Sequence, residues 1–193
     1  MHYNFFAMVS RMKYIKRWAL MRNSREENIS EHSLEVAMLS HALTVISNRR
    51  LGNNLDANKA ALIGIYHDTT EIITGDMPTP IKYYNAQIQG AFKDIEKGAA
   101  KQLLSLLPDD LRVDYESIFY KKDEDGYLWK LVKAADKLSA LTKCIEERKA
   151  GNTEFLSAEN SLRQVLKDMR LEEVDIFMVE MLPSYEKNLD ELN

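Results

Sequence analysis

Apolar residues recur at steps of three and four along most of the chain, which is the spacing of one face of an α-helix. The clearest case is the segment 85–107, whose apolar stripe consists of Ile88, Phe92, Ile95, Ala99, Leu103 and Leu106. We find no alternating apolar and polar stretch of useful length for a β-strand, and no internal repeat. The pattern therefore predicts an all-α protein.

Capping residues and helix breakers set the expected boundaries. Ser30 is placed to cap a helix over 31–47, and Asp56 to cap a helix over 57–74. Gly75 follows as a residue that can close that helix in a left-handed conformation. The helices that we predict are 5–20, 31–47, 57–74, 85–107, 110–120, 127–150, 154–170 and 173–191.

Composition supports one packed helical domain. The chain has 193 residues, of which 45% are hydrophobic, and only 7 are Gly and 4 are Pro. This length suffices for one domain with a sizeable core and is short for two. We therefore expect a single domain over residues 1–193.

The net charge and the length of the apolar runs argue against nucleic-acid and membrane partners. With 26 basic and 30 acidic residues, the net charge of −4 offers no surplus for binding a nucleic-acid backbone. No apolar run approaches the roughly 20 residues that span a bilayer. The aromatic and basic segment 1–23 is expected to form a core helix with a basic edge, with a membrane-surface helix as the alternative. From the charge and the apolar runs we expect neither a nucleic-acid nor a membrane partner. Because the single Cys144 cannot form an internal disulfide, we expect a cytoplasmic protein.

Three polar residues lie unusually close together near the end of the expected helix 57–74. Glu71 is four residues after His67 and three after Asp68, so all three side chains can border one cavity. The alternative is a solvated helix end without a function.

Two further residues strengthen the case for a metal site. His32 lies in the first turn of another expected helix, and Asp136 lies on a mostly apolar face of a third. A carboxylate on such a face is costly to bury unless it is paired or bound to a cation. A salt bridge to Lys133 or Lys137 is the alternative. Two imidazoles and two carboxylates suit one divalent cation such as Mn, Co, Fe or Zn, and do not choose among them.

The order His32, His67-Asp68, Asp136 resembles the H…HD…D signature of the HD-domain metal-dependent phosphohydrolases. Four stretches carry a closer similarity to the bacterial HD-domain 5′-deoxynucleotidases of the YfbR type: "RWALMRN", "ENISEHSLEVAMLSHAL", "YHDTTEIITGDMPTPIKYYN" and "LVKAADKLSALTKCIEE". The resemblance implies an HD-type helical bundle with a metal-binding core at about 28–145 and C-terminal helices over 154–191. It also suggests a homodimer, for which the C-terminal helices could supply the interface if their apolar residues are not core.

The resemblance also assigns roles to individual residues. It implies one divalent cation, such as Co or Mn, bound by His32, His67, Asp68 and Asp136. It implies catalytic roles for Glu71 and Arg17. The residues that it places against the substrate are Arg17, Trp18, His32, Asp68, Asp76, Met77, Pro78, Thr79 and Asp136.

Two of these assignments have plainer alternatives. In the family the "GDMPTP" loop reads the deoxyribose, with Asp76 accepting a hydrogen bond from the 3′-hydroxyl; as a bare pattern it is equally a helix-terminating turn. Arg17 and Trp18 are by themselves also compatible with a solvated Arg beside a core Trp.

We therefore expect a divalent-metal-dependent phosphomonoesterase that hydrolyses deoxyribonucleoside 5′-monophosphates and selects against ribonucleotides. One alternative keeps the HD centre and assigns another nucleotide phosphoester, such as a triphosphate, a cyclic nucleotide or an alarmone. A non-catalytic helical signalling module is the other. The presence of all four ligand-type residues and Glu71 argues against the latter.

Overall fold

The computed structural model describes residues 2–82 and 84–192, with the backbone alone for Thr79 and Pro80. Within these residues the regular structure is helical, apart from an isolated β-bridge between Lys16 and Asn28. The α-helices are α1 (Phe5–Val9), α2 (Ile29–Arg50), α3 (Ala57–Tyr66), α4 (Glu71–Thr74), α5 (Thr79–Lys82), α6 (Ala86–Leu104), α7 (Asp109–Phe119), α8 (Gly126–Lys149), α9 (Leu156–Asp168) and α10 (Glu172–Glu180). Short 3₁₀ turns are Ser10–Tyr14, Asp123–Asp125, Thr153–Phe155, Leu182–Glu186 and Leu189–Glu191. The all-α prediction is confirmed.

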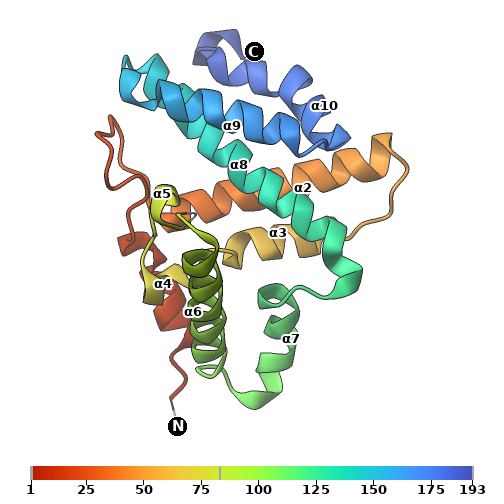
Figure 1. Ribbon diagram of the computed structural model, residues 1–193. Helices are drawn as coiled ribbons and strands as arrows, with labels where there is room; N and C mark the ends of the chain where they lie inside the picture. The colour runs from red at the N-terminus through yellow and green to blue at the C-terminus, as the bar shows by residue number, and fades with distance from the viewer. Residues whose placement is uncertain (1, 83, 193) are drawn as a thin grey trace.

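The two longest helices, α2 and α8, cross at the centre of the molecule, and α3 packs against both (Figure 1). Helices α9 and α10 cover one side of this crossing, and α6 and α7 extend from the other (Figure 1). The main core lies where these helices meet, because burial of their apolar faces removes hydrocarbon from water. Fully buried members of this core include Val36, Leu43, Ile63, Leu131, Leu138, Leu141 and Ile145.

A second, smaller apolar cluster fixes the N-terminal segment. Phe5 is fully buried against Leu103, Leu104 and Leu107 at the end of α6. Its ring also packs edge-on against Tyr115 of α7, with 5.2 Å between the ring centroids. The cluster therefore ties α1 to α6 and α7.

The predicted helix starts are confirmed in one case and wrong in another. The Asp56 carboxylate caps α3 by accepting a hydrogen bond from the Lys59 amide. Helix α2, by contrast, begins two residues earlier than expected. Asn28 rather than Ser30 is its N-cap, in a capping box with Glu31.

The first and last predicted helices are too long. Helix α1 ends at Val9, and after the 3₁₀ turn the backbone becomes extended because residues 15–17 pair with residues 27–29. At the other end α10 stops at Glu180, and a 3₁₀ turn with Pro183 as its second residue follows from Leu182. Proline lacks the amide hydrogen that a continuing helix would need. None of the helices described here is long and apolar enough to cross a membrane.

Gly64 allows α3 to approach α2 very closely. A Cβ atom at this position would lie 2.7 Å from the Ala37 Cα and 2.9 Å from the Ala37 amide nitrogen. Because these are backbone atoms, no side-chain rotation could relieve the clash. The crossing of α2 and α3 therefore requires glycine here.

We expect Gly64→Ala to lower the free energy of unfolding by about 1–3 kcal/mol, the usual cost of forcing extra volume into a packed interior. Denaturant unfolding measures the change. Gly98→Ala is the matched control: Gly98 lies on the exposed face of α6 with no atom within 4 Å of an added Cβ. This control should be stabilised by roughly 0.5–1 kcal/mol, because alanine favours a helix more than glycine does. Equal effects at the two positions would contradict the close-approach argument.

Candidate metal centre

The N-terminus of α2 presents His32 to the centre of the molecule, and an extended pairing brings Arg17 beside it. The Arg17 amide donates to the Glu27 carbonyl at 3.0 Å, and the Ile29 amide donates to the Ile15 carbonyl at 3.0 Å. Arg17 and Trp18 therefore lie in an irregular segment, and the prediction that a helix over 5–20 carries them was wrong. His32 is fully buried.

A turn interrupts the expected helix 57–74 between His67 and Thr70. The Thr69 amide donates to the Tyr66 carbonyl, and the Glu71 amide donates to the Asp68 carbonyl, in the short-range pattern of a turn. Thr69 is fully buried against Met12, which anchors the turn to the N-terminal segment. The prediction of one continuous helix was wrong, although Gly75 closes α4 with a φ of 73° as expected.

Side chains from α2, this turn and α8 converge at one point. His32 Nε2 lies 3.2 Å from Asp136 Oδ1 and 3.5 Å from Asp68 Oδ2. His67 Nε2 lies 3.0 Å from the same Asp68 oxygen. One ligand atom each from His32, His67 and Asp68 lies within 4.8 Å of the others. Asp136 borders this group through His32, while its Oδ2 accepts a hydrogen bond from Lys137.

Hydrogen bonds on the far side of each imidazole set its orientation. His67 Nδ1 lies 2.8 Å from the Gly64 carbonyl oxygen, which can only accept, so Nδ1 carries the proton. His32 Nδ1 lies 2.9 Å from the Ser139 hydroxyl. Both Nε2 atoms are buried and make no hydrogen bond within the described residues. Two buried nitrogen lone pairs facing carboxylate oxygens fit a divalent cation, since His ligands are usually fixed through their second nitrogen.

The electrostatics favour charged carboxylates and a neutral His32. Burial and the nearby Arg17 lower the pKa of His32 to about 4. Burial also lowers the pKa of His67, but the adjacent Asp68 carboxylate outweighs it and the pKa ends above its ordinary value. Burial would raise the pKa of Asp68, but the His67 imidazole lowers it to about 2. Burial is likewise outweighed at Asp136, where the His32 contact holds the pKa well below its usual value.

Glu71 and Asp76 behave differently from these carboxylates. Burial, with Asp68 and Asp76 nearby, raises the pKa of Glu71 to about 9. Its Oε2 atom is buried without a hydrogen-bond partner among the described residues. Burial also raises the pKa of Asp76, against the opposing effect of Arg17. Glu71 is therefore a proton-carrying group at neutral pH in the metal-free site.

Glu27 holds the residues of the "RW" pair together. Its Oε2 atom accepts from Arg17 at 2.9 Å and from the Trp18 indole N–H at 3.1 Å. Burial lowers the pKa of Arg17, but Glu27, Asp136, Asp68 and Asp76 together raise it above its ordinary value. Trp18 has a φ of 56°, which is rare for a bulky residue. The bond to Glu27 and the packing of its ring on Phe155, 5.3 Å away, hold it there.

The "GDMPTP" loop follows α4 and leads into α5. Asp76, Met77 and Pro78 are partly buried, and the Pro78 carbonyl accepts from the amides of Ile81 and Lys82 to start α5. The side chain of Thr79 lies outside the described part of the chain. Asp76 is close enough to Arg17 and Asp68 for their charges to shift its pKa, so this loop borders the same centre.

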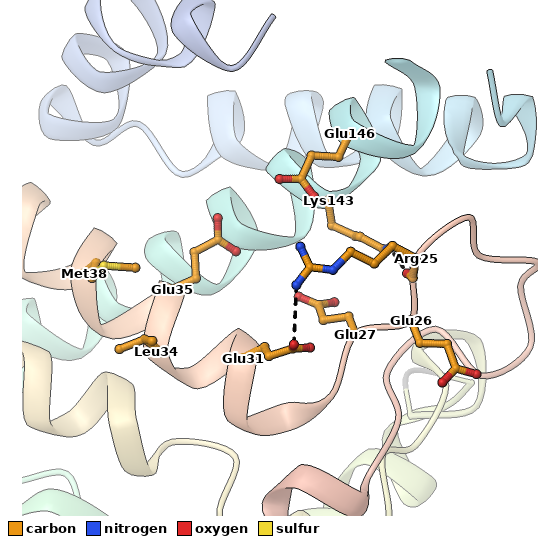
Figure 2. Close-up of a pocket in the computed structure, with 9 residues that line it drawn as sticks. All are labelled: Arg25, Glu26, Glu27, Glu31, Leu34, Glu35, Met38, Lys143 and Glu146. Atoms are coloured by element: carbon orange, nitrogen blue, oxygen red, sulfur yellow. Dashed lines mark hydrogen bonds and ion pairs between the residues drawn. The ribbon is translucent and has the colours of Figure 1, made fainter. Parts of the chain in front are cut away.

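Three polar residues around the centre were not predicted from the sequence: Glu27, Glu35 and Ser139. Glu35 is three residues after His32, and Ser139 is three after Asp136, so each shares a helical face with an expected ligand. That spacing was the available signal for both. Glu27 lies in irregular structure, where no periodicity could point to it. Glu27 and Glu35 also line a cavity of about 270 Å³ with Arg25 and Glu146 (Figure 2).

Solved structures share this fold. A crystal structure of an HD-domain phosphohydrolase from Listeria innocua superposes with a TM-score of 0.80 at 21% identity, covering 94% of this chain and 88% of the other. A cyanophage S-2L HD phosphohydrolase bound to dA and one catalytic Zn²⁺ superposes with a TM-score of 0.64 at 19% identity, covering 94% and 96%. The prediction of an HD-type helical bundle is confirmed.

Sequence relatives are much closer. A 5′-deoxynucleotidase from Erwinia tasmaniensis is 48% identical over 192 residues, which cover 100% of this chain and 97% of the relative. A 5′-deoxynucleotidase from Shewanella oneidensis is 47% identical over 188 residues, covering 97% and 96%. The model of the family described as "5′-deoxynucleotidase YfbR-like" matches residues 4–185. The chain therefore belongs to the YfbR-like 5′-deoxynucleotidase family.

Proposed function

We propose that this protein is a divalent-metal-dependent phosphomonoesterase that hydrolyses deoxyribonucleoside 5′-monophosphates to a deoxynucleoside and phosphate. The observation that carries the proposal is the pair of buried Nε2 lone pairs, on His32 and His67, facing the carboxylates of Asp68 and Asp136. Its occurrence in a chain of the YfbR-like family supports this substrate class.

In this proposal His32, His67, Asp68 and Asp136 hold one divalent cation, within a core at about 28–145. The donor set of nitrogen and oxygen is compatible with Co, Mn, Fe or Zn. When bound, the cation supplies a Lewis acid and lowers the pKa of a coordinated water toward neutrality. Because His32, Asp68 and Asp136 line the same point, they also border the phosphate.

Arg17 and Glu71 do the remaining chemistry on the phosphate. The Arg17 guanidinium, held at one end by Glu27, has further N–H groups for phosphate oxygens and for the charge that grows as the P–O5′ bond breaks. Water attacks phosphorus, the 5′-oxygen leaves, and one proton moves from the water to that oxygen. Glu71 orients the water or relays this proton, a role that suits a buried carboxyl with a raised pKa.

The loop from Asp76 to Thr79 recognises the sugar in this proposal. Asp76 accepts a hydrogen bond from the 3′-hydroxyl, and Met77, Pro78 and Thr79 close around the deoxyribose so that a 2′-hydroxyl is disfavoured. Pro78 and Pro80 limit the motion of the backbone, which helps a loop to discriminate a single hydroxyl. Trp18, whose ring packs at a tilt against Phe155, packs against the nucleotide in this proposal.

We further propose a cytoplasmic homodimer. The buried thiol of Cys144 needs no oxidising compartment. Exposed apolar side chains that suit a second copy include Leu34 and Met38 of α2, which are 59% and 58% exposed. Val179 and Leu189 near the C-terminus, at 75% and 79%, are also available. Such residues support an interface because large exposed apolar surface is unfavourable in water.

A substrate panel tests the activity. With Co²⁺ or Mn²⁺ the purified protein should release orthophosphate from dAMP, dGMP and dTMP, and at least tenfold more slowly from AMP and GMP. A missing hydrogen bond or a steric clash in a built site commonly costs that much or more. A chelated sample is the control. Release of pyrophosphate or tripolyphosphate from dNTPs in place of orthophosphate would favour the alternative phosphoester activity, and no release with any metal would refute the proposal.

Asp76→Ala tests sugar recognition. The wild type should hydrolyse dAMP about 10–100-fold more efficiently than 2′,3′-dideoxyadenosine 5′-monophosphate, because a hydrogen bond to a charged acceptor contributes about 1.5–3 kcal/mol. The variant should lose that preference and treat the two substrates alike, as measured by kcat/KM. Asp76→Asn keeps an acceptor oxygen and should retain part of the preference. An Asp76→Ala enzyme with the wild-type ratio would show that the 3′-hydroxyl is read elsewhere.

Metal affinity should rise as the pH increases through the raised pKa of His67. Below its raised pKa the His67 imidazole holds a proton that the cation must displace, whereas His32, with a pKa of about 4, is already neutral. Glu71, protonated in the metal-free site, also releases its proton if the cation lowers its pKa. The affinity should therefore change by about tenfold per pH unit on the acid side, with proton release. Isothermal titration in buffers of different ionisation enthalpy measures both, and the exposed His41→Gln variant should match the wild type. An affinity independent of pH would contradict the proposed ligands.

A further inference from the structure

A chain of hydrogen bonds extends from His32 away from the metal centre. His32 Nδ1 lies 2.9 Å from the Ser139 hydroxyl, which donates to Glu35 Oε2 at 2.6 Å. Thr142 Oγ1 donates to the second Glu35 oxygen at 2.8 Å. The chain joins α2 to α8 directly behind an expected ligand.

The number of protons fixes the direction of this chain. The Ser139 hydroxyl has one proton, which it donates in the hydrogen bond to the Glu35 carboxylate. Toward His32 the same hydroxyl therefore presents a lone pair. His32 must then carry its own proton on Nδ1 and keep the Nε2 lone pair directed at Asp68 and Asp136. A carboxylate in this place therefore selects the imidazole form that a metal requires.

The two histidines are held by different means. His67 is oriented by the backbone carbonyl of Gly64, which no substitution of a side chain removes. His32 depends on two side chains, of which Ser139 is fully buried. The carboxylate of Glu35 reaches the edge of the cavity in Figure 2, where Glu31 and Glu146 lie nearby. Such a buried chain of polar groups, joining an expected ligand to a charged residue, needs a reason beyond packing.

We propose that Glu35 and Ser139 are positioning residues that orient His32 for metal binding and strengthen it as a ligand. This inference rests on the proposed metal site. Neither residue touches the substrate or the reacting atoms. Glu35 acts through Ser139, and Ser139 acts through His32.

Metal titration of the intact protein tests the inference without reference to activity. Ser139→Ala breaks the chain and should weaken the binding of Co²⁺ or Mn²⁺ about 10–100-fold, the usual effect of losing a group that orients a metal ligand. Glu35→Ala should have a smaller effect in the same direction, since water from the cavity can replace part of the carboxylate. Glu35→Gln keeps an acceptor without the charge and should fall between Glu35→Ala and the wild type.

Two further variants separate positioning from folding. Ser139→Thr retains the hydroxyl and should restore affinity to within a few-fold of the wild type. Tyr127→Phe, at the N-terminal end of α8, removes a hydrogen bond to the buried Glu173 of α10 and should leave the affinity unchanged. The double variant Ser139→Ala with Glu35→Ala should bind no more weakly than Ser139→Ala alone, because both changes break one chain.

The outcomes are distinguishable. Folded Ser139→Ala and Glu35→Ala proteins that bind metal within twofold of the wild type would overturn the inference and leave the proposed activity intact. A wild-type protein that binds no divalent metal would instead overturn the proposed function on which the inference rests. If Ser139→Ala does not fold, as judged by circular dichroism, the metal affinities of Glu35→Gln and Glu35→Ala are compared with that of the wild type. Affinities of both variants within twofold of the wild type would then overturn the inference.

Discussion

The close contact of α3 with α2 at Gly64 is the constraint on which the site depends. A glycine is needed because an added Cβ would fall within 2.7 Å of the Ala37 backbone. The same residue supplies the carbonyl that fixes the His67 ring. With the two helices this close, the rings of His32 and His67 come within 5.2 Å of each other. One residue without a side chain thus sets both the packing of the helices and the spacing of two imidazoles.

The surroundings of the site balance a concentration of negative charge. Asp68, Asp136, Glu71 and Asp76 lie near one another in a largely buried region, and Arg17 is the cation whose charge acts on all four. Glu27 in turn holds Arg17 and Trp18 in position. Because burying like charges together is unfavourable, Glu71 keeps a proton in the metal-free site. The arrangement is therefore suited to a cation and an anionic substrate together.

Periodicity predicted what local sequence determines and failed where tertiary contacts decide. The stripe of 85–107 gave α6 nearly to its end, although Ile95 in that stripe is exposed. The apolar pattern of 57–74 continues through His67, so the local sequence did not predict a turn there. The turn is accompanied by the His67–Gly64 hydrogen bond and the burial of Thr69. Likewise residues 15–17 leave the helical pattern because they pair with 27–29, a contact that no short window of sequence contains. The polar residues on regular helices could be named in advance, whereas Glu27, held in that pairing, could not.

The turn after α3 leads from the His67–Asp68 pair to Glu71. His67 itself keeps helical dihedrals, with φ of −59° and ψ of −37°, and its Nε2 lies 3.0 Å from the Asp68 carboxylate. After the turn, α4 begins at Glu71, whose carboxyl lies close enough to Asp68 for the two charges to interact. Hydrogen bonds then fix the imidazoles from behind, by backbone for His67 and by side chains for His32. These bonds are formed within the protein itself, so the proposed ligands would be in place before a cation binds. Bringing these charges together lowers the free energy of unfolding, and a bound cation would raise it again because it binds only the folded protein.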